Sequence, residues 1–504
     1  MSHRRFPFVR VLLLCLFVQT AGQGEQALPD SSVHRSFMNL YRTAGLMESS
    51  ETAPAGYAIH PIDRARRNTA LTREVFGYFP YWFRTRWTQL DYRLVSTIAY
   101  FSGEVNADGS VGNTHGWPKY TGDPSAVADV VSMINTAHAN GVRVVLCFTN
   151  FTSAEIDLII GTPQYRTTFI RQALAIVQAG NGDGVNIDFE GINSSSKNAL
   201  TQFMQALADS FHTRLPGSQV SCAPTDYDTR AGDWDLPVLY NAVDLFFFQG
   251  YGYGWSGSST ARPVGLLPNT SFWGSLNIMT LIDFVLTRMP ADKVLLGVPH
   301  YGRRWPTVSG EVKAATQGTG TAFYYPDALG YIATYGRLWE QSALNPWFRY
   351  QDGTQWYQGW YDDPQSMSHK YRLVLDRNLK GVGMWALGMD AGNHDIWDVL
   401  AQFFGEVSGV AAHGSVPERL ELRQNFPNPF NPATTIEYAV PRTGFVSLLV
   451  FNVLGQEIAL LVHEEQSAGN HSVAFDAAGL PAGSYFAVLR AGGQRVMQKM
   501  LLVK

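Results

Sequence analysis

Three polar side chains alternate along a short apolar run near the middle of the chain. Asn186, Asp188 and Glu190 occupy every second position of the stretch NGDGVNIDFEG, and apolar residues separate them. Side chains alternate across a β-strand, so these three groups share one face. Buried carboxylates are costly unless they are paired or take part in chemistry. The negative charge of Asp188 would raise the proton affinity of Glu190 towards working pH, as general acid catalysis requires. In the structural alternative, a strand-end acid caps a loop or pairs with arginine.

The elements around this strand indicate a barrel. Apolar β-rich runs alternate with helix-period segments at residues 75–82, 94–102, 142–148, 184–190, 219–224, 243–251, 293–302 and 381–388. Eight such strands predict a parallel (β/α)8 (TIM) barrel over residues 71–405. The connection after the seventh strand is long, which predicts a small α+β insertion at about 303–363. Barrel enzymes do their chemistry at the C-terminal ends of the strands, where Glu190 would reach the mouth with Asp188 one step deeper.

The two ends of the chain differ from this pattern. Three arginines before the apolar run VLLLCLFVQTAG predict a signal peptide at residues 1–22, too short for a membrane span. Residues 23–70 are predicted to be a leader or linker with at most one short helix, around VHRSFMNLYRTAGL. Residues 406–423 are small and polar and predict a second linker. Residues 424–504 alternate in short runs between turns, which predicts an antiparallel β-sandwich.

Composition excludes several classes of function. A net charge of −4 carries no electrostatic footprint for nucleic acid. We expect no metal and no other cofactor, because the histidines and cysteines show no ligand spacing. All 13 tryptophans lie between Trp82 and Trp397, which fits either a large core or a groove that stacks on sugar rings. Cys147 and Cys222 fall on separate predicted strands, which favours two free thiols over a disulfide.

Several of these stretches together resemble glycoside hydrolase family 18, the chitinase family. The segment DGVNIDFE is similar to the signature Asp-Gly-x-Asp-x-Asp-x-Glu of the fourth barrel strand; it matches at Asp183, Gly184, Asp188 and Glu190 and departs at Asn186. VFGYFPYW, LLGVPHYGRRW and GVGMWALGMD resemble the first, seventh and eighth strands. The resemblance covers most of residues 75–400.

The resemblance implies a substrate-assisted mechanism and a set of site residues. Glu190 would be the general acid, and the 2-acetamido oxygen of the sugar would attack the anomeric carbon to form an oxazolinium ion. Asp188 would orient the acetamido N–H, and Tyr251 would bind its carbonyl. Asp183, as part of the signature, is grouped with these catalytic residues. The expected substrate-binding residues are Trp385 as the floor of the sugar site, together with Asn186, Gln249, Tyr78 and Tyr301.

Two departures from the family pattern leave the function open between three readings. Asn186 replaces the deepest acid of the row, although its amide can still hydrogen-bond Asp188, and Gly252 stands where an aspartate is usual. The resemblance favours hydrolysis of β-1,4 links of N-acetylglucosamine polymers such as chitin. Asparagine in branches related to spore-cortex lytic enzymes keeps peptidoglycan open as a substrate. A non-catalytic, lectin-like glycan-binding protein is the third reading.

The C-terminal segment has a resemblance of its own. FPNPFNPATTIEY, LPAGSYFAVLRAGG and the final MQKMLLVK are similar to the type A sorting domain of the type IX secretion system. This implies the secretion machinery as a partner, export to the cell surface or beyond, and removal of the domain afterwards. The other expected partner is a polysaccharide substrate; no nucleic acid partner and no stable membrane span are expected, and the protein is expected to be a monomer.

Overall fold

The computed structural model of the 504-residue chain describes residues 32–44, 58–62, 71–118, 124–405, 419–425, 428–466 and 468–503. The predicted signal peptide (1–22) and most of the predicted linker at 406–423 lie outside these residues. No helix within the described ranges has both the length and the apolar character needed to cross a bilayer.

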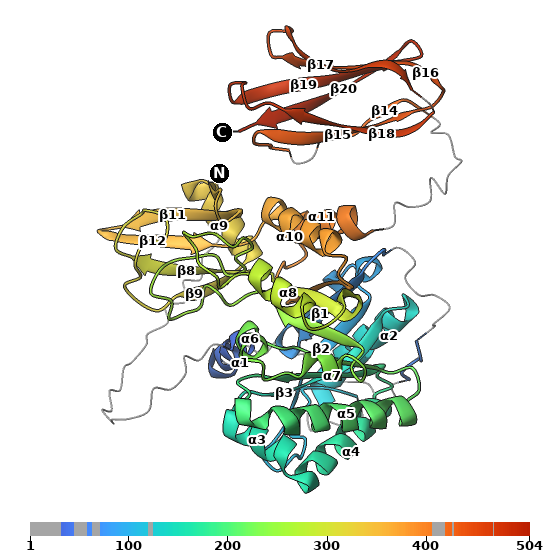
Figure 1. Cartoon of the computed structure of the whole chain (residues 1–504), viewed down its shortest axis with the longest axis vertical. Coiled ribbons are helices and arrows are strands. Elements are labelled where there is room, and N and C mark those ends of the chain that lie inside the picture. Colours follow the sequence, from blue (N-terminus) through green and yellow to red (C-terminus); the bar gives the residue numbers. More distant parts are fainter. Residues whose placement is uncertain are drawn as a thin grey trace, which may run out of the picture. The chain divides into compact units, whose positions relative to one another are not determined.

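Eight parallel strands close into a barrel with the neighbour order β1-β13-β7-β6-β5-β4-β3-β2. Figure 1 labels β1, β2 and β3 among them. These strands are β1 (Glu74–Pro80), β2 (Thr97–Glu104), β3 (Arg143–Asn150), β4 (Gly184–Phe189), β5 (Gln219–Cys222), β6 (Leu245–Gln249), β7 (Val294–Pro299) and β13 (Gly381–Trp385). The barrel helices are α2 (Pro124–Ala139), α3 (Ser153–Gly161), α4 (Pro163–Ala179), α5 (Lys197–Arg214), α6 (Asp226–Ala231), α7 (Leu236–Leu239), α8 (Ile278–Leu286), α10 (Pro364–Asp376) and α11 (Asp395–Phe404). Every residue of β4 is buried, as expected for a strand with helices outside and packed side chains inside. The predicted TIM barrel is confirmed.

Some strand limits differ from the prediction. The first strand stops at Pro80, and the 3-10 helix η2 (Tyr81–Gln89) begins there. The run expected as one strand at 293–302 divides at His300. β7 ends before this residue, and β8 (Tyr301–Thr307) begins after it as an antiparallel member of another sheet. Apolar periodicity continues through the break, so the sequence alone does not mark it.

The insertion predicted at about 303–363 is present. It is a five-stranded sheet in the order β10-β11-β12-β8-β9, with one helix. Its elements are β8, β9 (Thr321–Tyr324), α9 (Tyr325–Tyr335), β10 (Leu338–Glu340), β11 (Asn345–Asp352) and β12 (Gln355–Trp360). His300 alone separates the end of barrel strand β7 from Tyr301, the first residue of β8 and of this sheet.

A short helix precedes the barrel in sequence and packs into it. α1 (Val33–Ala44) begins after Ser32, whose hydroxyl accepts a hydrogen bond from the backbone N–H of Arg35 at 2.9 Å, an N-capping contact. Val33, Phe37 and Met38 are buried and belong to the same apolar cluster as the barrel core. A helix was expected in this segment, but only as part of a leader or linker. Its docking against the barrel corrects that interpretation for residues 32–44.

The C-terminal segment forms a β-sandwich, as predicted. One sheet has the order β14-β15-β18 and the other β17-β16-β19-β20, with antiparallel neighbours in both. Side chains from both sheets share one apolar cluster, so the sheets pack face to face. The strands are β14 (Glu421–Leu422), β15 (Ala433–Val440), β16 (Gly444–Asn452), β17 (Glu457–Gln466), β18 (Gly469–Asp476), β19 (Gly483–Ala491) and β20 (Gln494–Leu502).

The two cysteines of the barrel are free and buried, as predicted. Cys147 lies on β3 and Cys222 on β5, and β4 separates these strands in the barrel. Burial raises the pKa of both thiols, which keeps them protonated and unreactive.

Candidate active site

Two acids lie at the C-terminal end of β4. Asp188 is the fifth residue of the strand, and Glu190 follows directly after its end; both side chains are buried. The backbone N–H of Glu190 donates to Asn150 O at the end of β3 at 3.3 Å, which holds Glu190 at the mouth of the barrel. The predicted alternation along the strand therefore brings two carboxylates to the end at which barrel enzymes work.

Gln249, at the end of β6, contacts the acids. Its Nε2 donates to Glu190 Oε1 at 3.1 Å and to the backbone oxygen of Ala223 at 3.1 Å, and it lies 3.5 Å from Asp188 Oδ1. Glu190 Oε2 is buried and has no hydrogen-bond partner among the described residues. Gln249 thus orients one carboxylate oxygen of Glu190.

Asn186 sits one step below Asp188 and bonds elsewhere. Its Oδ1 accepts from the hydroxyl of Tyr78 at 2.9 Å, and its Nδ2 donates to Ser221 Oγ at 2.9 Å. The side chain is completely buried. The expected hydrogen bond to Asp188 is absent from the contacts of the described residues, because Tyr78 and Ser221 occupy both ends of the amide. Tyr78, expected among the substrate-binding residues, lies in the barrel core and supports Asn186.

The pocket between the acids holds a side chain of α1. His34 Nδ1 lies 2.5 Å from Asp188 Oδ2 and 3.0 Å from Glu190 Oε1, and His34 Nε2 lies 2.8 Å from the hydroxyl of Tyr251. The imidazole stacks on the indole of Trp385, with ring centroids 3.8 Å apart and planes inclined by 29°. Both ring nitrogens and one ring face are therefore engaged, and His34 is fully buried.

The charges in this pocket are mutually dependent. Burial by itself lowers the pKa of His34, but the facing charges of Asp188 and Glu190 outweigh it and raise that pKa to about 9. Burial raises the pKa of Asp188 to about 7, against the opposing effect of His34. Burial acts in the same direction on Glu190, yet the positive charge and hydrogen bond of His34 prevail and lower its pKa. The prediction that Asp188 raises the proton affinity of Glu190 is therefore wrong while His34 is in place.

The aromatic side chains expected to bind sugar line the same pocket. Trp385, the last residue of β13, is buried beneath His34, and its indole Nε1 has no hydrogen-bond partner among the described residues. Tyr301 is also buried, and its ring meets Phe37 of α1 edge-on with centroids 5.1 Å apart. Trp385 ends β13, and Tyr301 lies two residues beyond the end of β7. Both are therefore near the mouth of the barrel, where a flat sugar ring would enter.

Asp183 lies apart from these acids, at the N-terminal end of β4. Its Oδ2 accepts from the backbone N–H of Val144 at 2.8 Å and lies 2.9 Å from His138 Nε2. These contacts tie α2 and β3 to the start of β4. The expected catalytic role of Asp183 is not supported by this position, and we infer that the residue stabilises the base of the barrel.

Sequence reasoning missed two residues beside the acids. His34 lay in a segment interpreted as a linker, and a lone histidine in a helix-period run does not reveal what it contacts. Asp228, on α6, is buried, and its Oδ2 accepts from the backbone N–H of Gly191 at 3.1 Å. Burial raises the pKa of Asp228 to about 7. Its position next to Gly191 comes from the fold, since no motif marks it.

The three titratable groups at the pocket do not form a ready metal site. One ligand atom each from His34, Asp188 and Glu190 lies within 4.8 Å of the others. However, the 2.5 Å between His34 Nδ1 and Asp188 Oδ2 is a hydrogen-bond separation, and two ligands each about 2 Å from one ion lie farther apart than this. His34 and Asp188 instead form a hydrogen-bonded ion pair.

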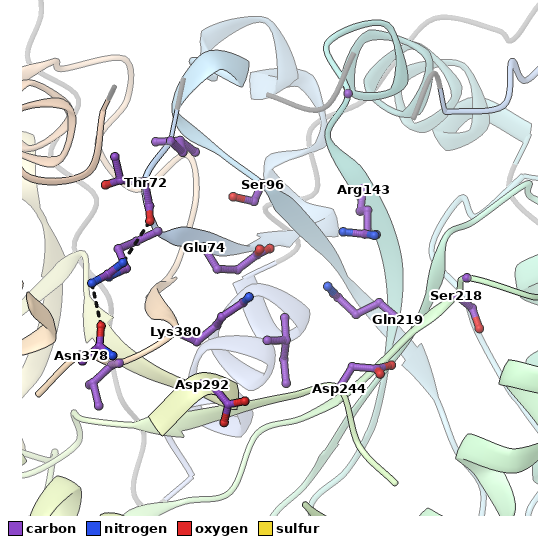
Figure 2. A pocket seen from close by; sticks show the side chains of 16 residues that line it. Thr72, Glu74, Ser96, Arg143, Ser218, Gln219, Asp244, Asp292, Asn378 and Lys380 are labelled. Carbon is purple, nitrogen blue, oxygen red and sulfur yellow. Dashed lines mark hydrogen bonds between the residues drawn. The ribbon is translucent and has the colours of Figure 1, made fainter. Parts of the chain in front are cut away.

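Two cavities on the described part of the barrel domain lie outside this pocket. The larger, about 670 Å³, is at the N-terminal ends of the strands and is lined by charged groups of both signs (Figure 2). Its lining includes Arg143 and Lys380 together with Asp244 and Asp292, so no single charge dominates. The other, about 400 Å³, lies beside α1 at the C-terminal ends of β2 and β3 and is lined in part by Met38, Glu104 and Asn150. Of these two, the second lies at the end of the barrel that carries the acids.

Family models match both domains. The model described as glycosyl hydrolases family 18 matches residues 74–390, and the model described as a secretion system C-terminal sorting domain matches residues 424–504. The first match contains the acids of β4, Gln249, Tyr251 and Trp385, but not α1.

Individual relatives agree with the first match. Di-N-acetylchitobiase of Rattus norvegicus is 28% identical over 49% of this chain and 71% of its own length. The cortical fragment-lytic enzyme of Bacillus subtilis is 27% identical over 44% of this chain, and the match spans half of that enzyme.

Solved structures share the fold. A family 18 chitinase of Cycas revoluta in complex with (GlcNAc)3 superposes with a TM-score of 0.58 at 15% identity, over 66% of this chain and 99% of that chain. The spore cortex-lytic enzyme of Bacillus cereus superposes with a TM-score of 0.54 at 18% identity, over 67% and 75%.

Proposed function

Since the chain belongs to glycosyl hydrolase family 18, we propose that it hydrolyses β-1,4 links of N-acetylglucosamine polymers by a substrate-assisted, retaining mechanism. Its barrel is a glycoside hydrolase domain, and its C-terminal domain is a sorting domain of the type IX secretion system. The preferred substrates are chitin and chitooligosaccharides. The sorting domain indicates secretion or attachment to the cell surface.

One observation carries this proposal: Asp188, Glu190, Tyr251 and Trp385 surround one buried pocket at the mouth of the barrel. Gln249 orients Glu190, and both Asp188 Oδ2 and the hydroxyl of Tyr251 contact the same ring of His34. A single small group in this pocket is thus within reach of a carboxylate, a phenol and an indole face. A 2-acetamido sugar offers an N–H, a carbonyl and an apolar ring face to these same partners.

The proposed reaction uses these positions. Glu190 donates its proton to the glycosidic oxygen, and the bond from that oxygen to the anomeric carbon breaks. The acetamido oxygen of the same sugar forms a new bond to that carbon, giving an oxazolinium ion. Asp188 accepts the acetamido N–H and stabilises the positive charge, while Tyr251 holds the acetamido group. Glu190 then takes a proton from water as the water oxygen bonds to the anomeric carbon. The bond from that carbon to the acetamido oxygen breaks, which restores the acetamido group and leaves the configuration retained.

The general acid is tested by Glu190→Gln, which keeps the shape of the side chain and removes its transferable proton. We expect kcat on a chromogenic N,N′-diacetylchitobioside to fall by about 10²–10⁴-fold, with binding of chitooligosaccharide retained. Glu311→Gln makes the same chemical change at a carboxylate that is 87% exposed, and should leave the rate unchanged. Full activity of the Glu190 variant would refute the assignment.

Peptidoglycan is the second candidate substrate, because the chain is similar to cortical fragment-lytic enzymes. The bonds cleaved and the residues in named roles stay the same; only the neighbouring sugar differs. Product analysis by mass spectrometry on chitin and on purified cell wall separates the two. Chitobiose from chitin with no release from cell wall supports the first substrate, and the reverse pattern supports the second.

A non-catalytic glycan-binding protein is the alternative that Gly252 and Asn186 motivate. It predicts binding of chitooligosaccharide without turnover in any variant. Hydrolysis that disappears in the Glu190→Gln variant would exclude it. We also propose that the sorting domain is removed after export, which intact-mass measurement on the exported protein would reveal.

A further inference from the structure

The helix α1 fills the pocket that the proposed reaction requires to be empty. His34 contacts Asp188 Oδ2 at 2.5 Å and the hydroxyl of Tyr251 at 2.8 Å, and stacks on Trp385 at 3.8 Å. In the proposed mechanism these three side chains receive the acetamido group and the sugar ring. The sugar and His34 cannot occupy this space together.

The imidazole of His34 also resembles the proposed intermediate in its chemistry. A protonated imidazole is a flat, five-membered ring that carries a delocalised positive charge and N–H donors at its edge. The oxazolinium ion is likewise a flat, five-membered cation with an N–H directed at Asp188. A site built to stabilise such a cation binds its mimics more tightly than the substrate itself. Two buried carboxylates around the imidazolium supply that stabilisation.

The rest of α1 secures the histidine in place. Val33, Phe37 and Met38 are buried on the same side of the helix. Phe37 packs edge-on against Tyr301 at 5.1 Å and lies 6.2 Å from Trp385, measured between ring centroids. His34 lies in the first turn of α1, so the positive end of the helix dipole faces the acids. Apolar packing and charge therefore favour the same docked position.

Gly252 leaves room for α1 at the position where the family resemblance led us to expect an aspartate. Its φ is +85°, a conformation that favours glycine, and a Cβ at this position would lie 3.3 Å from Val33 Cγ2. The carboxylate of an aspartate would extend further, into the space of α1. The missing side chain thus makes room for the helix.

Docking also places Glu190 in the wrong state for catalysis. Burial raises the pKa of this carboxyl, but the charge and hydrogen bond of His34 outweigh burial and lower it. A general acid needs the opposite shift, so that it holds its proton at working pH. Departure of α1 removes the neighbouring positive charge and restores that condition.

We propose that α1 is a built-in inhibitor, in which His34 occupies the place of the oxazolinium ring and excludes sugar until the helix leaves the pocket. This inference rests on the proposed function for the identity of the excluded ligand. The inhibition arises from the contact between α1 and the barrel of the same chain, so it requires no other protein.

Activity of the full-length chain gives the first test. His34→Ala removes the ring, and Phe37→Asp places a charge in the apolar contact. Each should raise kcat/KM on the chromogenic chitobioside by roughly tenfold or more, the factor expected when docking loses one charge-assisted hydrogen bond or its equivalent. Ser36→Ala is the matched control, because the Ser36 hydroxyl donates only within the helix, to Ser32 O at 2.9 Å. If the wild type hydrolyses the chitobioside, unchanged or lower activity in both test variants would overturn the proposal.

Two further measurements separate failure of the inhibitor from failure of the proposed activity. Calorimetry with chitotetraose compares Glu190→Gln with the Glu190→Gln/His34→Ala double variant, and tighter binding to the double variant supports the inhibitor without any turnover. Amide hydrogen exchange requires no sugar. The backbone of residues 33–44 should be protected in the wild type and lose protection in Phe37→Asp.

The combined outcomes are decisive. If no variant hydrolyses sugar but α1 is protected in the wild type and released in Phe37→Asp, the inhibitor stands and the catalytic proposal fails. If Glu190 proves catalytic and α1 exchanges equally fast in all variants, the catalytic proposal stands and the inhibitor fails. If His34→Ala loses activity as Glu190→Gln does, His34 belongs to the working site and α1 is not an inhibitor.

Discussion

At the scale of the residue, Asn186 is a neutral side chain where an aspartate would add a third buried negative charge to those of Asp188 and Glu190. Its amide donates to Ser221 and accepts from Tyr78, so both of its polar ends are satisfied. A carboxylate at this depth would lie one step below Asp188 on the same face of β4. Like charges close together raise each other's pKa. Asparagine at position 186 thus avoids charge repulsion with Asp188 and Glu190, and it still makes two buried hydrogen bonds.

Asn186→Asp should therefore shift the acidic limb of the pH–rate profile to higher pH, because the added carboxylate makes the acids above it harder to ionise. We expect a stability loss of about 1–3 kcal/mol, typical of disturbing a buried hydrogen-bond pair. Ser221→Ala removes one of the same hydrogen bonds without adding charge, and should lower stability while leaving the pH profile in place. An unmoved acidic limb in Asn186→Asp would assign this position to packing.

Asp183 belongs to the same motif as Asp188 and Glu190 but lies at the opposite, N-terminal end of β4. Asp183→Asn should lower the free energy of unfolding of the barrel by about 1–3 kcal/mol, since it weakens the buried contacts to Val144 N and His138. Its kcat/KM per folded molecule should stay within about twofold of the wild type. Thermal denaturation and kinetics on the same samples check both statements. A loss of rate comparable with that of Glu190→Gln would return Asp183 to the catalytic group.

At the scale of the element, α1 is held by charge as well as by apolar burial. The pKa of His34 is raised from 6.5 to about 9, chiefly because the facing acids outweigh the effect of burial. A group whose pKa is raised on folding contributes stability below its ordinary pKa and loses that contribution as pH rises through the folded value. The contribution of His34 is therefore fully present below about pH 6.5 and absent above about pH 9.

Because the stabilising contribution of His34 is lost as pH rises, its effect on the melting temperature should depend on pH. The difference in Tm between wild type and His34→Ala should be largest near pH 5–6 and should shrink as pH rises from 6.5 to beyond 9. Ser36→Ala should differ from wild type by the same amount at every pH. Differential scanning calorimetry across this range checks the trend. A difference that grows with pH would mean that His34 docks as a neutral ring.

At the scale of the whole molecule, the chain combines a hydrolase barrel with an export domain. The sorting domain matches residues 424–504 and forms a sandwich with an apolar core of its own. A domain with its own core folds independently of the barrel's reaction. Recognition for export and hydrolysis are therefore expected to be separable.

A chain that ends at residue 423 should remain inside the cell envelope of a host with type IX secretion, while the full chain reaches the surface or the medium. Cell fractionation with immunodetection follows the protein, and Glu190→Gln in the full chain provides the control, since it should be exported normally. Equal export of the truncated chain would show that residues 424–504 are not the export signal.

The sequence by itself determined the barrel and the row of polar groups on β4. Strand alternation and βα periodicity are local properties, so Asn186, Asp188 and Glu190 were predicted on one face at the working end, and the long connection after the seventh strand revealed the insertion. Only the tertiary structure decided what faces the acids. His34 lies 154 residues from Asp188 and 217 from Tyr251, and no local period encodes a contact over such a separation. The same holds for Gly252, whose missing side chain acquires its meaning only beside Val33.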